Sequence, residues 1–497
     1  MSTSKILLGY DIGTSSIKLS ALDADSGLLL ASATYPDEEM SLHSEKQGWA
    51  EQSPEMWWKC VVAATKAIVS EVKKENIIAI GITYQMHGLV AVDKEKNVLR
   101  PSIIWCDSRA VEIGNNAFKS IGEEYCLEHF LNSPGNFTAS KLKWVKENEP
   151  EVYEKIHKIM LPGDYIAMKM TNIIQTTVSG LSEGIMWDFK EGKIADKLLD
   201  YYGIEETLIP DLVETFSDQG SLTKSAADEL NLPEGIKITY RAGDQPNNAF
   251  SLNVLNPGEL AATAGTSGVV YGITNSPDYD PQSRVNTFVH VNHKKENPRY
   301  GVLLCVNGTG ILNSWFKNNM TGLSKMTYQE MNEVISKAPV GARGLVILPF
   351  GNGAERVLGN KDIKSQINGL NFNLHDQAHM FRALQEGIVF ALNYGFEVMQ
   401  GMGIKLDTVK AGKANMFLSP IFRETFTNVT GAAVELYNTD GSQGAARGAG
   451  VGLGYYASFS EAFSGLNTIL TVEPNEQEKE KYLEAYGHWL EVLKQYL

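Results

Sequence analysis

Residues 6–22 read Ile6-Leu7-Leu8-Gly9-Tyr10-Asp11-Ile12-Gly13-Thr14-Ser15-Ser16-Ile17-Lys18-Leu19-Ser20-Ala21-Leu22, and this stretch decides the fold. Apolar residues lead up to Asp11, a polar turn follows at Gly13, and apolar residues alternate again after it, which is the pattern of a β-hairpin. Gly13 allows a tight turn and a close backbone approach, while Thr14 and Ser15 add hydroxyl groups. Successive N–H groups in such a turn can hold a phosphate, and Asp11 could engage a phosphate-bound Mg²⁺. An ordinary hairpin with an Asp at its neck is the alternative.

The same pattern returns about half a chain length later, in residues 260–273, where Gly265, Thr266 and Ser267 form the predicted turn. A repeat on this scale predicts two similar domains, each offering a phosphate-binding hairpin to a shared cleft. We place the boundary between residues 250 and 251, so that the domains are residues 1–250 and 251–497. Two hairpins that are alike by chance are the alternative.

Composition limits the classes of function. With 497 residues, 43% hydrophobic and 21% charged, the chain has the composition of a soluble protein with two large cores. Its net charge of −15 argues against nucleic acid or an anionic membrane as the main partner. The four cysteines are scattered without metal-ligand spacing, so neither a zinc site nor a disulfide framework is expected. The absence of a signal-peptide pattern and of a long apolar run favours a cytoplasmic protein.

Two predicted strands end in groups that could bind a sugar. The strand at residues 77–83 runs into Met86 and His87, and the strand near residue 103 runs into Trp105 and Asp107. Ligands of such sheets bind where strands end, and an aromatic wall with polar groups suits a sugar. A His satisfied by the backbone and a surface ion pair at Asp107 are the alternatives.

A third predicted strand ends at Gly243 and is followed by Asp244 and Gln245. A carboxylate between two phosphate loops could accept a hydroxyl proton while the oxygen attacks a γ-phosphoryl group. The alternative for Asp244 is the common role of a helix N-cap.

The second half of the chain offers further candidates. Gly310 follows a predicted strand, and Gly412 with Asn415 lies where another strand runs into a turn, which makes these segments candidate nucleotide contacts. Glu355 and Arg356 stand in a Gly-rich loop that we expect at the surface. Long helices are predicted over residues 378–399 and at the C-terminus. The C-terminal helix could form a homodimer interface or pack on its own domain.

Together these segments resemble the FGGY family of carbohydrate kinases over nearly the whole chain, and within it the branch that phosphorylates xylulose. The two hairpin turns are general marks of the wider superfamily that includes actin and hexokinase. Narrower matches are Trp49-Ala50-Glu51-Gln52, Gln85-Met86-His87-Gly88, Trp105-Cys106-Asp107, Phe137-Thr138-Ala139-Ser140-Lys141-Leu142 and Leu161-Pro162-Gly163-Asp164-Tyr165.

The resemblance implies an α/β fold of two similar actin/hexokinase-like (ribonuclease H-like) domains with the nucleotide and sugar in the cleft between them. Residues 1–250 would bind the sugar and residues 251–497 the nucleotide. The implied activity is ATP-dependent phosphorylation of D-xylulose to D-xylulose 5-phosphate, a step of D-xylose catabolism, with ATP and Mg²⁺ as cofactors. The implied partners are small molecules, without nucleic acid or membrane.

The resemblance also implies roles for particular residues. Asp244 matches the family's catalytic base and Asp11 its N-terminal catalytic acidic residue, and both would lie near Mg²⁺. Implied sugar contacts are Met86, His87, Trp105, Asp107 and Gln245; implied nucleotide contacts are Gly13, Thr14, Ser15, Gly265, Thr266, Ser267, Gly310, Gly412 and Asn415.

Two departures from the family pattern concern specificity. The family's adenine-side loop often reads Gly-Gly-Gly-Ala, whereas this chain has Ala411-Gly412-Lys413-Ala414, and Gln245 stands where Asn is common. A kinase of the same family for another ketose, polyol or sugar acid, such as ribulose, glycerol or gluconate, is therefore an alternative. A non-catalytic nucleotide or sugar sensor is a more distant one, because a pure binder has no need of carboxylates at Asp11 and Asp244.

Overall fold

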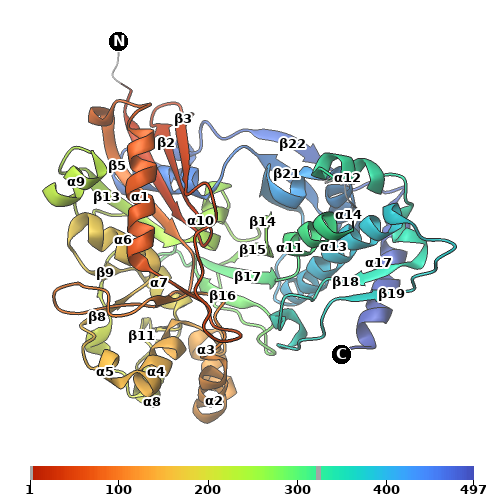
Figure 1. The fold of residues 1–497 in the computed structure, drawn as a ribbon, viewed down its shortest axis with the longest axis horizontal. Coiled ribbons are helices and arrows are strands. Elements are labelled where there is room, and N and C mark those ends of the chain that lie inside the picture. The colour runs from red at the N-terminus through yellow and green to blue at the C-terminus, as the bar shows by residue number, and fades with distance from the viewer. Residues whose placement is uncertain (1–3, 321–325) are drawn as a thin grey trace. The chain divides into compact units, whose positions relative to one another are not determined.

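The computed structural model describes residues 4–320 and 326–497 (Figure 1). The chain divides into two compact units. The first comprises the described residues up to Asn253 with Phe288–Tyr300 and Thr439–Leu466, and the second comprises those of Val254–Thr287, Gly301–Asn438 and Asn467–Leu497. The predicted halves, residues 1–250 and 251–497, were continuous, whereas in the structure two segments from the second half belong to the first unit. No helix within the described ranges is both long and apolar enough to span a membrane.

A five-stranded sheet forms the centre of the first unit. Its strands are β1 (Ile6–Ile12), β2 (Ile17–Asp23), β3 (Leu29–Tyr35), β5 (Ile77–Tyr84) and β13 (Lys237–Gly243), in the order β13-β5-β1-β2-β3. β1 pairs antiparallel with β2, which confirms the first predicted hairpin, and parallel with β5, which in turn pairs parallel with β13.

Helices cover both faces of this sheet, and alternate residues of β1 contact them. On one face, the Tyr10 hydroxyl lies 2.9 Å from that of Thr65 in α1 (Pro54–Ile68), a helix that Ser53 caps. On the other face, α15 (Gly441–Gly452) approaches the strands so closely that a Cβ atom on Gly9 would overlap the carbonyl oxygen of Ser442. The small residues of α15 permit this contact.

The remaining elements of the first unit are short. They are β4 (Glu51–Gln52), η1 (Lys74–Asn76), β6 (Val90–Val92), β7 (Ser102–Ile103), α2 (Val111–Ile121), α3 (Glu123–Phe130), α4 (Thr138–Asn148), α5 (Pro150–Tyr153), β8 (Lys158–Met160), α6 (Pro162–Thr171), β9 (Gln175–Thr176), α7 (Val178–Glu183), β10 (Trp187–Asp188), β11 (Lys193–Ile194), α8 (Asp196–Tyr202), η2 (Glu206–Leu208), β12 (Asp211–Leu212), α9 (Lys224–Leu230), α10 (Asp244–Ser251) and α16 (Phe459–Ala462).

A second sheet repeats the arrangement of the first. It contains β14 (Leu260–Ala264), β15 (Gly268–Thr274), β16 (Asn286–Val289), β17 (Tyr300–Val306), β20 (Thr408–Gly412), β21 (Ala433–Tyr437) and β22 (Thr468–Val472), in the order β16-β17-β15-β14-β20-β21-β22. β14 pairs antiparallel with β15 and parallel with β20, as β1 pairs with β2 and β5. The predicted second hairpin and the internal repeat are therefore confirmed.

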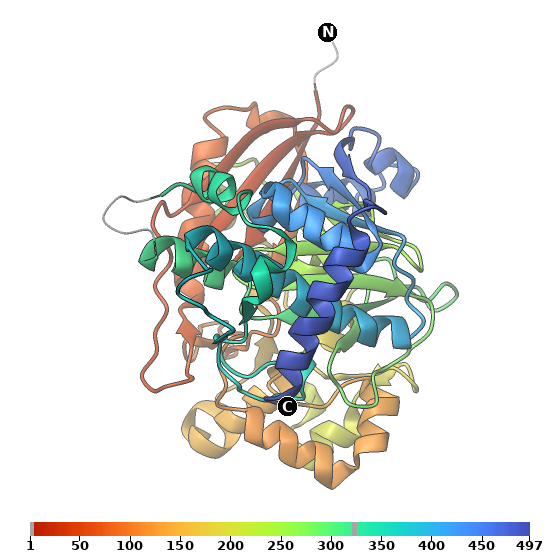
Figure 2. The ribbon, with the colours of Figure 1, turned by 90° about the vertical axis from the view of Figure 1, so that its right-hand side faces the viewer.

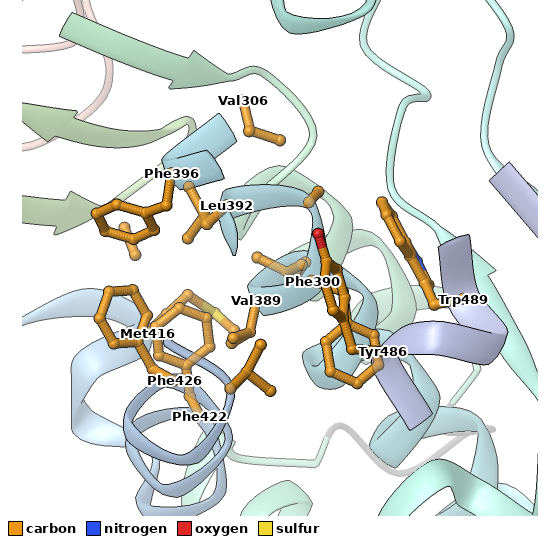
Figure 3. Packing of buried hydrophobic residues seen from close by; sticks show 14 of the residues in the cluster. Val306, Val389, Phe390, Leu392, Phe396, Met416, Phe422, Phe426, Tyr486 and Trp489 are labelled. Atoms are coloured by element: carbon orange, nitrogen blue, oxygen red, sulfur yellow. The ribbon is translucent and has the colours of Figure 1, made fainter. Parts of the chain in front are cut away.

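Three helices build the core of the second unit: α13 (Gln377–Gly401), α14 (Pro420–Thr430) and α17 (Lys479–Lys494). Phe396 of α13 packs edge-on against Phe426 of α14, with 5.6 Å between ring centroids (Figure 3). Trp489 of α17 is buried and donates from its indole nitrogen to the Ile347 carbonyl. Figure 2 shows α17 as the dark-blue helix that ends near the C-terminus. This helix thus packs on its own unit, while a role in a homodimer stays a prediction.

The other elements of the second unit are α11 (Gly310–Asn319), α12 (Tyr328–Ile335), η3 (Val340–Gly344), β18 (Val346–Leu348), η4 (Arg356–Leu358), β19 (Gln366–Asn368) and η5 (Asn415–Leu418).

Candidate active site

Three carboxylates from distant parts of the sequence meet at one edge of the first sheet. β1, β5 and β13 run parallel, so their C-terminal ends lie together. Asp11 lies near the end of β1, and Asp244 follows β13 as the first residue of α10. Asp440 caps α15 by accepting from the Gln443 N–H at 3.0 Å. Sequence reasoning missed Asp440, because no local pattern connects a helix cap to a strand end so far away in the chain.

The charges of these groups influence one another. Burial raises the pKa of Asp11 to about 7, the charges of Asp244 and Asp440 add to the rise, and Lys18 opposes it. Lys18 lies 2.7 Å from Asp440. Burial would raise the pKa of Asp440, but Lys18 and Ser442 lower it overall. Lys18 therefore interacts with Asp11 and Asp440, while Asp244 adds negative charge next to Asp11, and the site favours a further cation or a proton.

Asp244 has partners that orient it. Burial raises the pKa of Asp244 to about 6, and hydrogen bonds from the side chain and the backbone of Gln245 oppose the rise. Two residues further on, the Asn247 side chain donates to the Gly441 carbonyl at 2.8 Å and accepts from the Tyr240 hydroxyl at 3.1 Å. The first bond joins α10 to the start of α15, and so holds Asp244 in place relative to Asp440. Gln245, a predicted sugar contact, is shown as a partner of Asp244.

Met86 and His87 lie on the same side of the site as Asp244. His87 adopts a positive φ of 62°, and its ring Nδ1 lies 2.8 Å from the Glu183 carbonyl oxygen. A Cβ atom on Gly243 would lie 2.7 Å from the Met86 side chain and 2.6 Å from the Glu183 carboxylate. Glycine therefore permits Met86 and Glu183 to pack directly against the residue that precedes Asp244.

Two buried ionisable residues support this region and were not predicted. Burial raises the pKa of Glu183 well above its usual range, and the charge of Asp244 adds to the rise. Burial lowers the pKa of Lys141 to about 7; its amine donates to the carbonyls of His87 at 2.8 Å and Ile104 at 3.0 Å. Lys141 lies in one of the segments that resemble the family, but sequence reasoning assigned no role to its side chain. No local sequence pattern around Glu183 indicated a role for that residue.

Trp105 and Asp107 differ in what they offer a ligand. Trp105 is 37% exposed, and its indole nitrogen donates to the Thr14 hydroxyl at 3.0 Å, which links it to the first hairpin turn. Asp107 is fully buried and accepts hydrogen bonds from the Ala50 N–H at 2.6 Å and from the Arg109 guanidinium at 2.7 Å. The ion pair is therefore internal rather than on the surface, and a sugar contact by Asp107 stays a prediction.

The first hairpin turn presents its predicted phosphate contacts at the surface of the first unit. The Gly13 N–H donates to the Ser16 carbonyl at 3.1 Å, which closes the turn. Thr14 is half-buried, and its hydroxyl donates to the Gln85 side chain at 3.1 Å, whereas Ser15 is exposed. Phosphate binding by these residues stays a prediction.

The predicted nucleotide contacts of the second unit come together around the second hairpin turn. Gly310 donates its N–H to the Gly265 carbonyl at 2.9 Å, and Ile311 donates to the Thr266 carbonyl at 3.2 Å. A Cβ atom on Gly265 would lie 3.4 Å from the amide nitrogen of Asn415, which has a positive φ of 54°. Three separate segments thus converge at one turn.

The edge of this group includes two more predicted positions. Gly412 ends β20, and Lys413 donates its backbone N–H to the Tyr437 carbonyl at 2.9 Å while its side chain is exposed. Ser267, the last residue of the hairpin turn, is half-buried next to β15. The roles of Gly412 and Ser267 as nucleotide contacts stay predictions.

The expectation of a surface position for Glu355 and Arg356 was wrong for Glu355. Its side chain has no exposed surface, and its carboxylate accepts the Asn307 N–H at 3.1 Å. Arg356 is half-buried, and burial lowers its pKa to about 10. A Gly-rich loop pattern indicates a turn but does not say which side chain points inward.

Two carboxylates of the first unit are donors of the type that a nucleotide-borne Mg²⁺ takes, and that role stays a prediction. In residues 4–320 and 326–497, no three His, Cys, Asp or Glu side chains form a group that could hold a metal ion. Mg²⁺ in phosphate-transfer sites commonly takes one or two carboxylates, with phosphate and water oxygens as its other ligands. Asp11 and Asp244 can supply such a donor set, and Asp11 lies against Gly441, where a Cβ atom would overlap its carboxylate.

Comparisons with known proteins agree with this architecture. The chain is 29% identical over 494 residues to a xylulose kinase of Bacillus subtilis (strain 168), covering 96% of this chain and 94% of the relative. Among solved structures, a xyloylose kinase from Brucella ovis has a TM-score of 0.88 at 24% identity, covering 99% of both chains. A gluconate kinase from Lactobacillus acidophilus has a TM-score of 0.89 at 23% identity, covering 99% of this chain and 98% of that one.

Family models assign the two parts of the chain directly. Residues 6–251 match the N-terminal domain and residues 260–456 match the C-terminal domain of one family. Both matches contain one of the repeated hairpins, and the first contains Asp11 and Asp244. The chain belongs to the FGGY family of carbohydrate kinases.

Proposed function

We propose that this sugar kinase transfers the γ-phosphoryl group of ATP to the terminal hydroxyl of D-xylulose, giving D-xylulose 5-phosphate and ADP. The observation that carries the proposal is the position of Asp244, a half-buried carboxylate that follows β13, beside Met86 and His87, which follow the neighbouring parallel strand β5. The xylulose kinase of Bacillus subtilis, similar along nearly the whole chain, supports the choice of sugar.

Asp244 acts as the general base. With a pKa near 6 it is ionised at neutral pH, and it is a stronger base than an Asp in water. Gln245 orients its carboxylate toward the acceptor hydroxyl. In the loose transition state of phosphoryl transfer, alignment of the hydroxyl contributes more than basicity does.

The remaining groups bind and neutralise phosphate. Mg²⁺, when bound with ATP, neutralises charge on the transferring group, and Asp11 would hold it, directly or through water. Each hairpin turn, at Gly13–Ser15 in the first unit and at Gly265–Ser267 in the second, offers backbone N–H and hydroxyl donors of the kind that bind phosphate. Met86 and His87 hold the sugar carbons next to Asp244.

The acidic surroundings argue against an anionic acceptor. Asp11, Asp244 and Asp440 lie together. A sugar acid such as gluconate would bring its own carboxylate toward these groups, and like charges that meet at a binding site reduce affinity. A neutral ketose meets no such repulsion.

The test is a coupled ADP-release assay with ATP and Mg²⁺ across D-xylulose, D-ribulose, L-xylulose, glycerol and gluconate. We expect the highest kcat/KM with D-xylulose. A higher kcat/KM with another sugar would keep Asp244 as base but refute the assignment of the sugar and of its contacts at Met86 and His87. Binding of sugar and ATP without turnover on any of the five would favour the sensor function instead.

A further inference from the structure

Glu355 is a fully buried carboxylate that the proposed chemistry does not use. Its two oxygens each lie 3.1 Å from the backbone nitrogen of Asn307, and the Gly308 N–H is a second donor to the same carboxylate. Burial raises the pKa of Glu355 to about 8, and these two N–H groups oppose the rise. Burial of a carboxyl group lowers the stability of the folded state unless hydrogen bonds within the protein replace those to water.

The loop that Glu355 binds is closely confined. Asn307 also donates from its side chain to the Ala354 carbonyl at 3.1 Å, next to Glu355 in sequence. On the other side, a Cβ atom on Gly308 would overlap the Pro349 carbonyl oxygen. These contacts restrict the loop at both residues, Asn307 and Gly308. Glu355 supplies the acceptor for the backbone N–H groups of the same two residues.

The same loop leads directly into residues that contact the second hairpin turn. After Gly308 the chain enters α11, whose first N–H groups, those of Gly310 and Ile311, donate to the carbonyls of Gly265 and Thr266. A Cβ atom on Gly268 would lie 2.7 Å from the Thr309 hydroxyl, so Thr309 also packs against the hairpin. Displacing the loop would displace the carbonyls, and with them the turn.

We propose that Glu355 is a positioning residue for the nucleotide. It acts through the loop at residues 307–310 on the hairpin turn at residues 265–267. The inference rests on the proposed function in assigning the nucleotide phosphates to that turn. Holding the donors in place before ATP arrives reduces the ordering cost of binding. The role differs from phosphate contact, because Glu355 lies behind the loop and is enclosed by protein.

The test compares Glu355→Gln with Glu259→Gln. Glutamine is nearly isosteric, but it replaces one acceptor oxygen with an NH₂ group that cannot accept from an amide. Glu259 is a matched control in the same unit, because its carboxylate accepts the N–H groups of Leu255 at 2.6 Å and Asn256 at 2.9 Å. It precedes β14, whereas the hairpin turn follows that strand, so it does not reach residues 265–267.

We expect Glu355→Gln to weaken binding of Mg²⁺–ADP by about tenfold when calorimetry is done at about pH 9, where a carboxyl group with a pKa of about 8 is ionised. This factor corresponds to the loss of one hydrogen bond to a charged group. KM for ATP should rise by a similar factor, while KM for the sugar stays within about twofold of wild type. Hydrogen exchange should accelerate at residues 307–311 and 265–267, and Glu259→Gln should show neither effect.

Two results would overturn the proposal. One is Mg²⁺–ADP affinity of Glu355→Gln within about twofold of wild type, since removing the acceptor would then have no consequence for the nucleotide. The other is an equal loss of sugar and nucleotide affinity together with a large fall in Tm, which would indicate a general structural role. A wild-type enzyme that binds Mg²⁺–ADP but prefers another sugar would refute the proposed substrate and leave this test intact.

Discussion

A carboxylate that must accept a proton works best when its pKa lies near the working pH. The raised pKa of Asp244, about 6, predicts that kcat/KM falls as the pH drops below about 6, because only the ionised form can act as base. Asp244→Asn should lower kcat by at least about 100-fold and still bind sugar and Mg²⁺–ADP. A pH–rate profile and single-turnover kinetics measure both. More than about a tenth of wild-type kcat in the variant would contradict the assignment.

Asp11 links activity to stability. Its folded-state pKa of about 7 lies above the ordinary value of 3.8, so the folded state binds more protons than the unfolded state between these values. Stability therefore falls as the pH rises through this range, and the cost is complete above pH 7. We expect Asp11→Asn to raise Tm by a few degrees at pH 8 and by less at pH 5, and to reduce phosphoryl transfer.

A matched control for this prediction is Asp93→Asn. Hydrogen bonds from Asn97 lower the pKa of the exposed Asp93, which is the opposite direction to Asp11. Its replacement should therefore give no gain in Tm at pH 8. Differential scanning fluorimetry across pH compares the two. An Asp11→Asn variant that is no more stable than wild type at pH 8 would show that the three carboxylates do not repel one another as described.

Single residues of the site could be predicted from the sequence where a neighbouring strand or turn pattern marks their position. Asp11 lies near the end of an apolar strand, Gly265 lies in a turn between two strands, and Asp244 and Gly310 each follow a strand, so each has a signal within a few residues. Asp440 and Glu355 have none, because their role depends on a partner that folding brings near. Lys18 and Asp440, for example, form an ion pair although they lie 422 residues apart. Exposure of a loop side chain, as at Glu355, is likewise decided by packing.

At the scale of elements, the hairpins and long helices were predictable because their signals are periodic and local. The direction from which α15 covers the sheet was not, since it depends on how closely two backbones can approach. Gly9 and Gly81 of neighbouring strands both lie under this helix, and a Cβ atom on either would overlap a carbonyl oxygen of α15. The glycines of the strands, as much as the small residues of the helix, allow the contact.

This close contact predicts a severe effect of Gly9→Ala. The added methyl group would push α15 away, and with it Asp440 at the helix N-cap, so stability and activity should fall together. We expect a loss of at least about 3 kcal/mol, because the overlap is with backbone rather than with a flexible side chain. Gly487→Ala is the control: no atom lies within 4 Å of its Cβ position in α17, and the change should stabilise by about 0.5–1 kcal/mol. Urea unfolding measures both changes, and a Gly9→Ala variant of wild-type stability would contradict the packing.

At the scale of the whole molecule, the chain alternates between the units instead of completing one before the next. The family models meet near residues 251–260, and this is also where the first long segment of the first unit ends. Sequence reasoning placed a boundary there because the hairpin repeat begins again. It had no signal that α15, which follows the second repeat, returns to cover the first sheet.

The return of α15 predicts that residues 1–250 do not fold alone. Without α15, the side chains of Leu7 and Ala79, which pack on Ala446 and Ala449, would face water along one side of the sheet. The fragment would also lose Asp440, the partner of Lys18 at the active site. We expect it to show no cooperative thermal transition and to be digested rapidly by protease, because a sheet with one uncovered apolar face lacks half of its core. Adding residues 439–466 through a flexible linker should restore part of the protection. A cooperative transition in the fragment without this addition would show that the first sheet is stable without its covering helix.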